Sequence, residues 1–373
     1  MEEKIIRVAQ VIGMAVDGGT ESVWMNYYRH LDRTKIQFDF LVENESNIIN
    51  KKEIESMGGR VVIIPPYTNP FKYMKELKKI FKENHYDIVH SNMNAMSVFT
   101  LRAAKKAGIK VRIAHSHSTS NKKEWKKNIL KNLLRPFSKV YATHYLACSE
   151  LAGRWLFGNK TFDKGLVKIV ANAIDYDRFK FNESYREEIR NKYSLNDSYV
   201  VGHIGRFMTQ KNHKFVVEVF KGILELNPKS KLLLIGDGPL KPEIQSLVNE
   251  LNLADNVVFA ETRLDVEKYY SAMDMFIFPS LYEGLGMTAV EAQINGLKCV
   301  VSTNLPKDVE ISDNIRFMNL DEDLSNWSKS CINKDRTDKL MINRKYSIDE
   351  NVNLIIEMYQ SIAQNLVGGQ SFK

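Results

Sequence analysis

Two glutamates stand close together in the stretch FPSLYEGLGMTAVEAQINGLKCVVST, residues 278–303. Glu283 precedes a glycine-flanked turn, and Glu291 lies inside a predicted helix that begins near Gly286. The unpaired N–H groups at the start of that helix, aided by its dipole, suit an anion. Gly284 and Gly286 would let a phosphate touch the backbone. The two acids suit neutral hydroxyls on either side of it, Glu291 those of a ribose and Glu283 those of the group that the phosphate carries.

Two cations follow another predicted strand, in GHIGRFMTQKN. Arg206 comes directly after Gly205 at the strand end, and Lys211 is five residues further on. A planar guanidinium and a flexible ammonium suit a diphosphate, the first through forked hydrogen bonds and the second as a point charge. Taken alone, the pair is equally explained by solvated surface charges. Together with the two acids, it points to a nucleotide sugar as ligand.

The composition describes a globular protein of two domains. Its 373 residues exceed the size at which one core stops growing, about 250–300 residues. The three cysteines are widely spaced, with no C-x-x-C pair, which favours a reducing compartment over disulfides or zinc. The start MEEKIIRVAQVIG predicts a first strand and no signal peptide. No run approaches a membrane span, so we expect a cytoplasmic protein.

Positive charge is concentrated in the first half of the chain. Residues 1–172 contain 29 lysines and arginines against 16 acids, within a net charge of +8 for the whole chain. The segment from Arg102 to Lys139 holds 12 basic residues and one acid, Glu124. This imbalance predicts an anionic partner for the first half.

Short β-branched runs alternate with amphipathic helical stretches along the chain, the pattern of parallel sheets with crossover helices. Seven candidate strands precede the polar stretch from Asp175 to Ser198, which we interpret as the linker, and six follow it. The sequence therefore predicts an α/β fold of two Rossmann-like, doubly wound domains facing a central cleft. The expected domains are 1–175, which binds the acceptor, and 176–345, which binds the nucleotide sugar. A helix at 346–373 is expected to pack back on the first domain.

The motif EGLGMTAVE, with GHIGRFMTQKN upstream, resembles the signature of the retaining GT-B glycosyltransferases of family 4, the group 1 enzymes that build capsules and exopolysaccharides. VDGGTESV is similar to the glycine loop near the start of that family, and IVANAID to its end-of-domain element. The resemblance covers nearly the whole chain. It implies a hexosyltransferase that moves a sugar from a nucleoside diphosphate, with a UDP-sugar favoured, to a glycan or lipid-linked acceptor.

Residue roles follow from the same resemblance. It implies that Arg206 and Lys211 neutralise the leaving diphosphate, that Glu291 holds the ribose and that Glu283 holds the donor sugar. A donor-binding set follows: Gly18, Gly19, Arg206, Lys211, Glu283, Gly284, Leu285, Gly286, Met287 and Glu291.

A histidine after the fifth strand usually faces the transferred sugar in this family. VRIAHSHS offers His115 and His117. We favour His117, because alternation along the strand and into the loop makes it less likely to be packed inside. With it, the catalytic set is Glu283, His117, Arg206 and Lys211.

The expected reaction keeps the anomeric configuration and uses no metal or other cofactor, because cations and helix N–H groups stabilise the charge that develops on the diphosphate. Two D-x-D triplets, at Asp175 and Asp321, are of a kind that holds metal in an unrelated transferase fold. Neither follows a strand in a glycine-rich cleft, and we interpret them as a helix start and a solvated turn.

The segment KKEWKKNILKNLLRPF, residues 122–137, is amphipathic. It places Trp125, Ile129, Leu130, Leu133, Leu134 and Phe137 on one face, with lysines on the others. This predicts peripheral contact with an anionic membrane, on the inner face of the plasma membrane. The alternative is a domain helix that buries its apolar face against the sheet.

Other functions stay open at this stage. A nucleotide-sugar epimerase of GT-B fold, or a phosphorylase, would share the two-domain body. A basic nucleic-acid-binding protein would use the segment from Arg102 to Lys139, but its few aromatic side chains lie on an apolar face and form no stacking platform, so no nucleic acid is expected.

Overall fold

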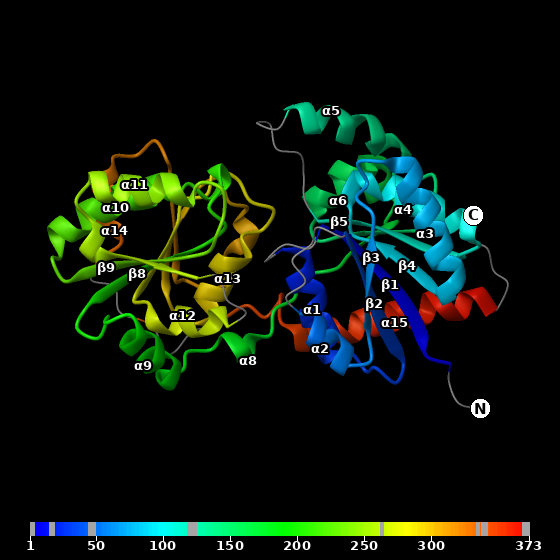
Figure 1. Cartoon of the computed structure of the whole chain (residues 1–373), viewed down its shortest axis with the longest axis horizontal. Helices are drawn as coiled ribbons and strands as arrows, with labels where there is room; N and C mark the ends of the chain where they lie inside the picture. Colours follow the sequence, from blue (N-terminus) through cyan, green and yellow to red (C-terminus); the bar gives the residue numbers. More distant parts are fainter. Residues whose placement is uncertain are drawn as a thin grey trace. The chain divides into compact units, whose positions relative to one another are not determined.

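The computed structural model describes residues 4–14, 19–43, 50–117, 125–261, 265–332, 336 and 342–367, without the side chains of 125–128 and 365–367. The chain divides into two compact units (Figure 1). Unit 1 comprises Met1–Ile174 and Lys345–Lys373, and unit 2 comprises Asp175–Arg344. Each unit is built on one parallel sheet.

The sheet of unit 1 has the strand order β3-β2-β1-β4-β5-β6-β7. Its strands are β1 (Ile6–Gly13), β2 (Ile36–Glu43), β3 (Arg60–Ile64), β4 (Ile88–Ser91), β5 (Val111–Ser116), β6 (His144–Ala147) and β7 (Val167–Ile169). Its helices are α1 (Thr20–His30), α2 (Lys51–Ser56), α3 (Pro70–Asn84), α4 (Ser97–Ala107), α5 (Trp125–Leu134), α6 (Glu150–Phe157), α7 (Asn159–Asp163) and α15 (Ile348–Val367).

The sheet of unit 2 has the order β10-β9-β8-β11-β12-β13. Its strands are β8 (Tyr199–Ile204), β9 (Ser230–Ile235), β10 (Val257–Ala260), β11 (Met275–Phe278), β12 (Lys298–Ser302) and β13 (Ile315–Met318). Its helices are α8 (Tyr176–Phe179), α9 (Glu183–Lys192), α10 (His213–Leu226), α11 (Lys241–Glu250), α12 (Val266–Ala272), α13 (Met287–Ile294) and α14 (Leu324–Ser330).

Both sheets confirm the predicted pair of doubly wound α/β domains. In each, the strand order reverses beside the first strand, between β1 and β4 in unit 1 and between β8 and β11 in unit 2. Loops that leave the carboxyl ends of strands at such a switch point diverge, so ligands of doubly wound sheets bind there. In unit 2, Arg206 and Lys211 follow β8, and Glu283 follows β11.

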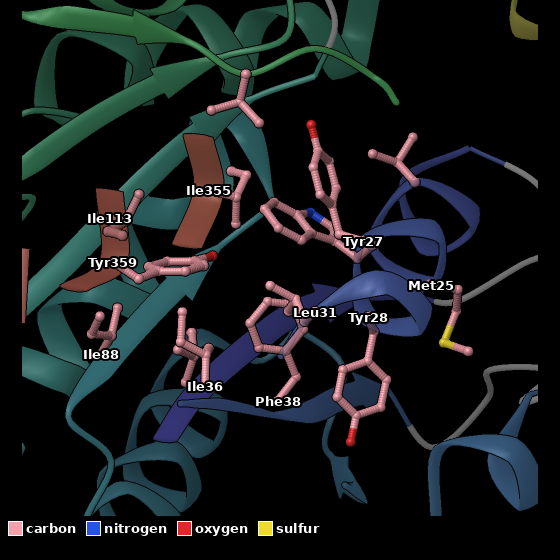
Figure 2. Packing of buried hydrophobic residues seen from close by; sticks show 14 of the residues in the cluster. Met25, Tyr27, Tyr28, Leu31, Ile36, Phe38, Ile88, Ile113, Ile355 and Tyr359 are labelled. Carbon is pink, nitrogen blue, oxygen red and sulfur yellow. The ribbon is translucent and has the colours of Figure 1, made fainter. Parts of the chain in front are cut away.

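Alternation along the strands divides the core of unit 1 into two layers. Val8 and Ile12 of β1 belong to the cluster under α1 and α15, whereas Ala9 and Val11 belong to the cluster under α3, α4 and α6. Figure 2 shows part of the first layer, in which Phe38 of β2 packs against both Tyr28 of α1 and Tyr359 of α15. Because both faces are covered, the strands are apolar almost throughout.

Helix α15 belongs to unit 1, although unit 2 separates it from the rest of that unit in sequence. The backbone of Ile348 donates to Ile174 O at 2.8 Å, and Ile174 pairs with Ser347 in a parallel bridge. Ile355 and Tyr359 are buried in the layer that contains α1. The helix therefore completes one apolar face of the sheet in unit 1.

The stretch predicted as a linker, Asp175 to Ser198, contains the helices α8 and α9 of unit 2. Arg186 and Arg190 of α9 both pair with Asp274, at 2.7 and 2.6 Å, just before β11. The polar composition that suggested a linker thus reflects ion pairs that fix α9 to unit 2.

Candidate active site

The loops after β8 and β11 are joined by hydrogen bonds at the switch point of unit 2. Gln210 accepts from Leu281 N at 2.9 Å through its backbone and donates to Tyr282 O at 3.0 Å through its side chain. Asn212 Nδ2 donates to Pro279 O at 3.2 Å. These bonds hold the two segments that carry the predicted cations and acids against each other.

Lys211 and Glu283 form an ion pair across these two loops. Lys211 Nζ lies 2.6 Å from Glu283 Oε1, and only 18% and 9% of the two side chains are exposed. The ammonium also lies 4.6 Å from the centre of the Phe278 ring. Two residues that the sequence singled out independently therefore meet, at the place where a ligand of such a sheet binds.

Gly205 makes room for the side chain of Lys211. A Cβ at this glycine would lie 3.1 Å from both Cγ and Cδ of Lys211. Arg206, the next residue, is exposed and enters none of the ion pairs between described residues. One cation of the predicted pair is thus bound to an acid, while the other faces solvent.

Close backbone packing explains why glycines stand at both ends of Gly236-Asp237-Gly238. A Cβ at Gly236 would lie 2.1 Å from Gly205 O, and one at Gly238 would lie 2.6 Å from Phe207 O. Phe207 N donates to Asp237 O at 2.8 Å. These glycines therefore allow close packing of two backbones, which supports the loop that carries Arg206.

Helix α13 begins directly after the glycine turn. Gly286 adopts φ +90° at the N-cap, and neither a side-chain cap nor an acid occupies the first turn. The amides of this end are therefore available to an anion. Two buried hydroxyl oxygens nearby, Ser280 Oγ and Thr288 Oγ1, have no hydrogen-bond partner among the described residues. Gly284 is exposed, Leu285 is buried and Met287 is half-buried.

Glu291 lies on α13 and bonds to a tyrosine that the sequence analysis did not identify. Tyr270 Oη on α12 donates to Glu291 Oε2 at 2.7 Å and lies 3.1 Å from Thr288 O. Burial raises the pKa of Glu291 to about 7, although the bond from Tyr270 opposes this shift. Near neutral pH the side chain is therefore divided between acid and carboxylate.

The remaining predicted site residues lie in unit 1. Gly18 lies outside the described residues, and Gly19 is the N-cap of α1 with φ +80°. His117 is half-buried directly after β5, and His115 is buried within it. His117 Nε2 lies 2.8 Å from Asn92 Oδ1, and its ring stacks on that of His115 at 4.0 Å.

Two further observations concern membranes and metals. No helix among the described residues is long and apolar enough to cross a membrane. In the D-x-D triplets, Asp175 caps α8 by accepting from Arg178 N at 3.0 Å, and Asp323 caps α14 by accepting from Ser325 N at 2.8 Å. These two aspartates serve as helix caps.

Comparisons with known proteins place this arrangement in a family. Residues 17–178 match the family model described as Glycosyltransferase Family 4, and residues 185–316 match the one described as Glycosyl transferases group 1. EpsF of Bacillus subtilis (strain 168), which is named as a glycosyltransferase, is 34% identical to this chain. The match covers 87% of this chain and 86% of EpsF. The chain belongs to the group 1 glycosyltransferases of family 4.

Other relatives extend the comparison over both units. The UDP-Gal:alpha-D-GlcNAc-diphosphoundecaprenol alpha-1,3-galactosyltransferase of Escherichia coli is 25% identical over 96% of this chain and 98% of its own length. The crystal structure of Anabaena Alr3699/HepE in complex with UDP-glucose aligns with a TM-score of 0.73 at 19% identity, covering 97% of this chain and all of that one. This second likeness supports the GT-B fold.

Proposed function

We propose that this glycosyltransferase moves a sugar from a UDP-sugar to a glycan or lipid-linked acceptor in polysaccharide biosynthesis, with the anomeric configuration kept. The observation that carries the proposal is the Lys211–Glu283 ion pair at 2.6 Å beside the uncapped start of α13. A diphosphate needs cations and amides, and a sugar needs acceptors for its hydroxyls. Both are present within a few residues of each other. The relatives that act on a UDP-linked donor or bind UDP-glucose support the choice of UDP.

Each residue has a task in this reaction. Lys211 and Arg206 stabilise the negative charge that develops on the leaving diphosphate, together with the first amides of α13. Glu291 accepts from the ribose hydroxyls, and Glu283 accepts from the donor sugar. We assign His117 to the transferred sugar and Gly18 and Gly19 to donor or acceptor.

Binding of the diphosphate changes the partners of Lys211. Its ammonium is neutralised by Glu283 in the structure. A diphosphate between Lys211 and Arg206 would draw the ammonium towards itself, and Glu283 would then be free to accept from sugar hydroxyls. The ion pair thus keeps both side chains in place until the donor replaces their mutual contact.

We further propose that the catalytic step needs no metal, because the two cations and the helix N-terminus supply the positive charge that a metal provides in other transferases. Thermal-shift screening against UDP-, GDP- and ADP-sugars identifies the donor, since a ligand that binds only the native state raises the melting temperature. Transfer of that donor is then followed by NMR of the product anomer, with and without a chelator. An inverted product would refute retention, and loss of transfer with chelator would refute metal independence.

We also propose that α5 rests on an anionic membrane surface. Ile129, Leu133 and Phe137 are 59%, 65% and 51% exposed, so these side chains do not pack against the sheet. Leu134 is half-buried against unit 1, which anchors the helix from its other side. The surplus of lysine and arginine from Arg102 to Lys139 complements anionic lipid. The enzyme would thereby be held where a lipid-linked acceptor is found.

A further inference from the structure

A chain of buried polar side chains crosses the layer of unit 1 that contains α1 and α15. Strands β1, β4 and β5 place apolar residues on this face at their start and polar ones towards their carboxyl ends, at Gln10, His90 and His115. All three are at most 1% exposed. Polar groups so deeply buried are found almost always with hydrogen-bond partners. The partners here identify a continuous path.

The path starts at a tryptophan. Trp24 Nε1 on α1 donates to Asn92 Oδ1 at 2.7 Å, and an indole nitrogen can only donate. The atom of Asn92 that accepts is therefore its oxygen, and its Nδ2 donates to Gln10 Oε1 at 3.0 Å. Gln10 Nε2 in turn donates to Tyr359 Oη at 2.9 Å. Trp24 thus fixes the orientation of both amides.

From Tyr359 the path continues through two histidines. Tyr359 Oη lies 2.7 Å from His90 Nδ1, and His90 Nε2 lies 3.0 Å from His115 Nδ1. Because the hydroxyl already accepts from Gln10, its single proton is free to go to His90 Nδ1. His90 then carries its proton on Nε2 and donates to His115, which carries its own on Nε2.

The opposite direction leaves more groups without partners. If His90 donated from Nδ1, the hydroxyl proton of Tyr359 would have no acceptor in the middle of the buried path. In the first direction the one donor left over is His115 Nε2–H at the end, and this atom has no partner among the described residues. Counting of hydrogen bonds therefore selects one direction.

The same tryptophan fixes His117. Asn92 Oδ1, which accepts from Trp24, also lies 2.8 Å from His117 Nε2, so His117 must carry its proton there. Its Nδ1 is left with a lone pair and no proton. Burial lowers the pKa of His117 to about 3, so the ring is neutral near neutral pH.

We propose that Trp24 and Tyr359 are positioning residues: Tyr359 fixes the tautomers of His90 and His115, and Trp24, through Asn92, leaves His117 with a nitrogen able only to accept. The group that faces this nitrogen must then be a hydrogen-bond donor, such as a sugar hydroxyl, and not a phosphate oxygen. This last step rests on the proposed transferase function. Tyr359 comes from helix α15, and Figure 2 shows its side chain among the buried side chains of this layer.

The tautomers are measured directly. Long-range ¹H–¹⁵N correlation spectra of ¹⁵N-histidine-labelled protein distinguish Nδ1–H from Nε2–H rings, and single His→Gln variants assign them. We expect Nε2–H for His90, His115 and His117 in the unaltered protein. A His90 ring protonated on Nδ1 would overturn the direction of the path. This measurement needs neither donor nor acceptor.

Tyr359→Phe tests the consequence. Removing the hydroxyl takes the donor from His90 Nδ1, so His90 and His115 become mixtures of tautomers. We expect both Nδ1–H and Nε2–H signals for His90 and His115 in this variant, with His117, which is held through Asn92, unchanged as Nε2–H. Tyr27→Phe is the matched control, because Tyr27 is equally buried in the same layer but donates to Ala171 O at 2.8 Å, outside the path.

The outcomes separate the two proposals. If His90 and His115 keep single tautomers in Tyr359→Phe, as they should in Tyr27→Phe, the positioning role of Tyr359 is refuted. If the unaltered protein transfers no sugar from any donor, the proposed function fails, while the spectra still decide whether the path has the direction given above.

Discussion

Lys211 Nζ lies 2.6 Å from Glu283 Oε1, so the cation expected on the diphosphate and the acid expected on the sugar neutralise each other. Both side chains are largely buried, and 72 residues separate them in sequence. A donor must therefore compete with an existing ion pair. The first two predictions follow from this competition.

Lys211→Met removes the cation while keeping the length of the apolar stem. We expect affinity for UDP, measured by calorimetry, to fall roughly 10- to 100-fold, since a hydrogen bond to a charged group contributes about 1.5–3 kcal/mol. Lys214→Met is the control. Lys214 is exposed, and its Nζ forms only a loose surface ion pair with Glu218, at 3.8 Å. Equal affinity in the two variants would exclude Lys211 from the diphosphate site.

Glu283→Gln has opposite effects on two ligands. Without the carboxylate, Lys211 is free to bind the diphosphate, so UDP alone should bind severalfold more tightly. The donor sugar loses its acceptor, so the advantage of the complete UDP-sugar over UDP should shrink. Calorimetry with both ligands measures this. Weaker binding of UDP alone would show that Glu283 does not compete for Lys211.

Glu291 gives the protein a pH dependence of known sign. Its pKa is about 7 in the folded protein against an ordinary 4.5, so the folded state keeps a proton that the unfolded state has lost. Its contribution to the free energy of unfolding is therefore full below about pH 4.5 and falls as pH rises to about 7, by roughly 3 kcal/mol. Denaturant titrations should show this decline relative to Glu291→Gln. Parallel curves for the two proteins would contradict the raised pKa.

The same ionisation should appear in donor binding. A carboxylate accepts from ribose hydroxyls better than the neutral acid does, so UDP affinity should rise as pH passes through about 7. The Glu291→Gln variant should lack this step.

Gly286→Ala tests the start of α13. Its φ of +90° is strained for alanine, and the new Cβ would lie 3.1 Å from Leu305 Cδ2. We expect a loss of about 1–2 kcal/mol in stability together with loss of UDP binding. Gly108→Ala is the matched control, since Gly108 has φ +91° in open space at the end of α4. Gly108→Ala should lose stability through backbone strain and keep its affinity for UDP. If Gly286→Ala also kept its affinity for UDP, the diphosphate would not bind at the start of α13.

Helix α5 is tested by vesicle flotation. Replacing Ile129, Leu133 and Phe137 by serine should weaken binding to anionic vesicles at least tenfold, because each side chain contributes about 1 kcal/mol or more when it leaves water. The same change at Phe71, Leu151 and Leu354, which are 84%, 65% and 62% exposed in other helices, is the control. A second variant, Lys122/Lys123/Lys126/Lys127→Glu, measures the electrostatic contribution to vesicle binding. Equal flotation of all variants would refute the membrane contact.

Much of the fold could be predicted because its signals are local. Each predicted strand run overlaps a strand of the structure, since β-branched runs between turn residues are read directly from the sequence. The Asp175 to Ser198 stretch was harder, because its helices are held by ion pairs from Arg186 and Arg190 to Asp274, more than 80 residues away. Composition alone does not show such pairings.

The candidate site likewise contains residues that the sequence indicates and residues that it does not. Glu283, Glu291, Arg206 and Lys211 stand out through their spacing from strand ends and glycines. Tyr270 does not, because a tyrosine in a short amphipathic helix is an ordinary core residue until its hydroxyl meets Glu291. Gln10 and His90 do carry a local signal, because each is a polar residue that directly follows apolar residues within a strand.

The sequence by itself determined the family, the two doubly wound domains and the motif residues after β8 and β11, because turn chemistry and hydrophobic periodicity act between neighbours in the chain. Tertiary structure decided which of these residues touch. Strand order brings Lys211 against Glu283, and the return of α15 to unit 1 brings Tyr359 to His90, 269 positions earlier in the chain. Contacts at such separation depend on how the sheets are wound, which no local pattern specifies.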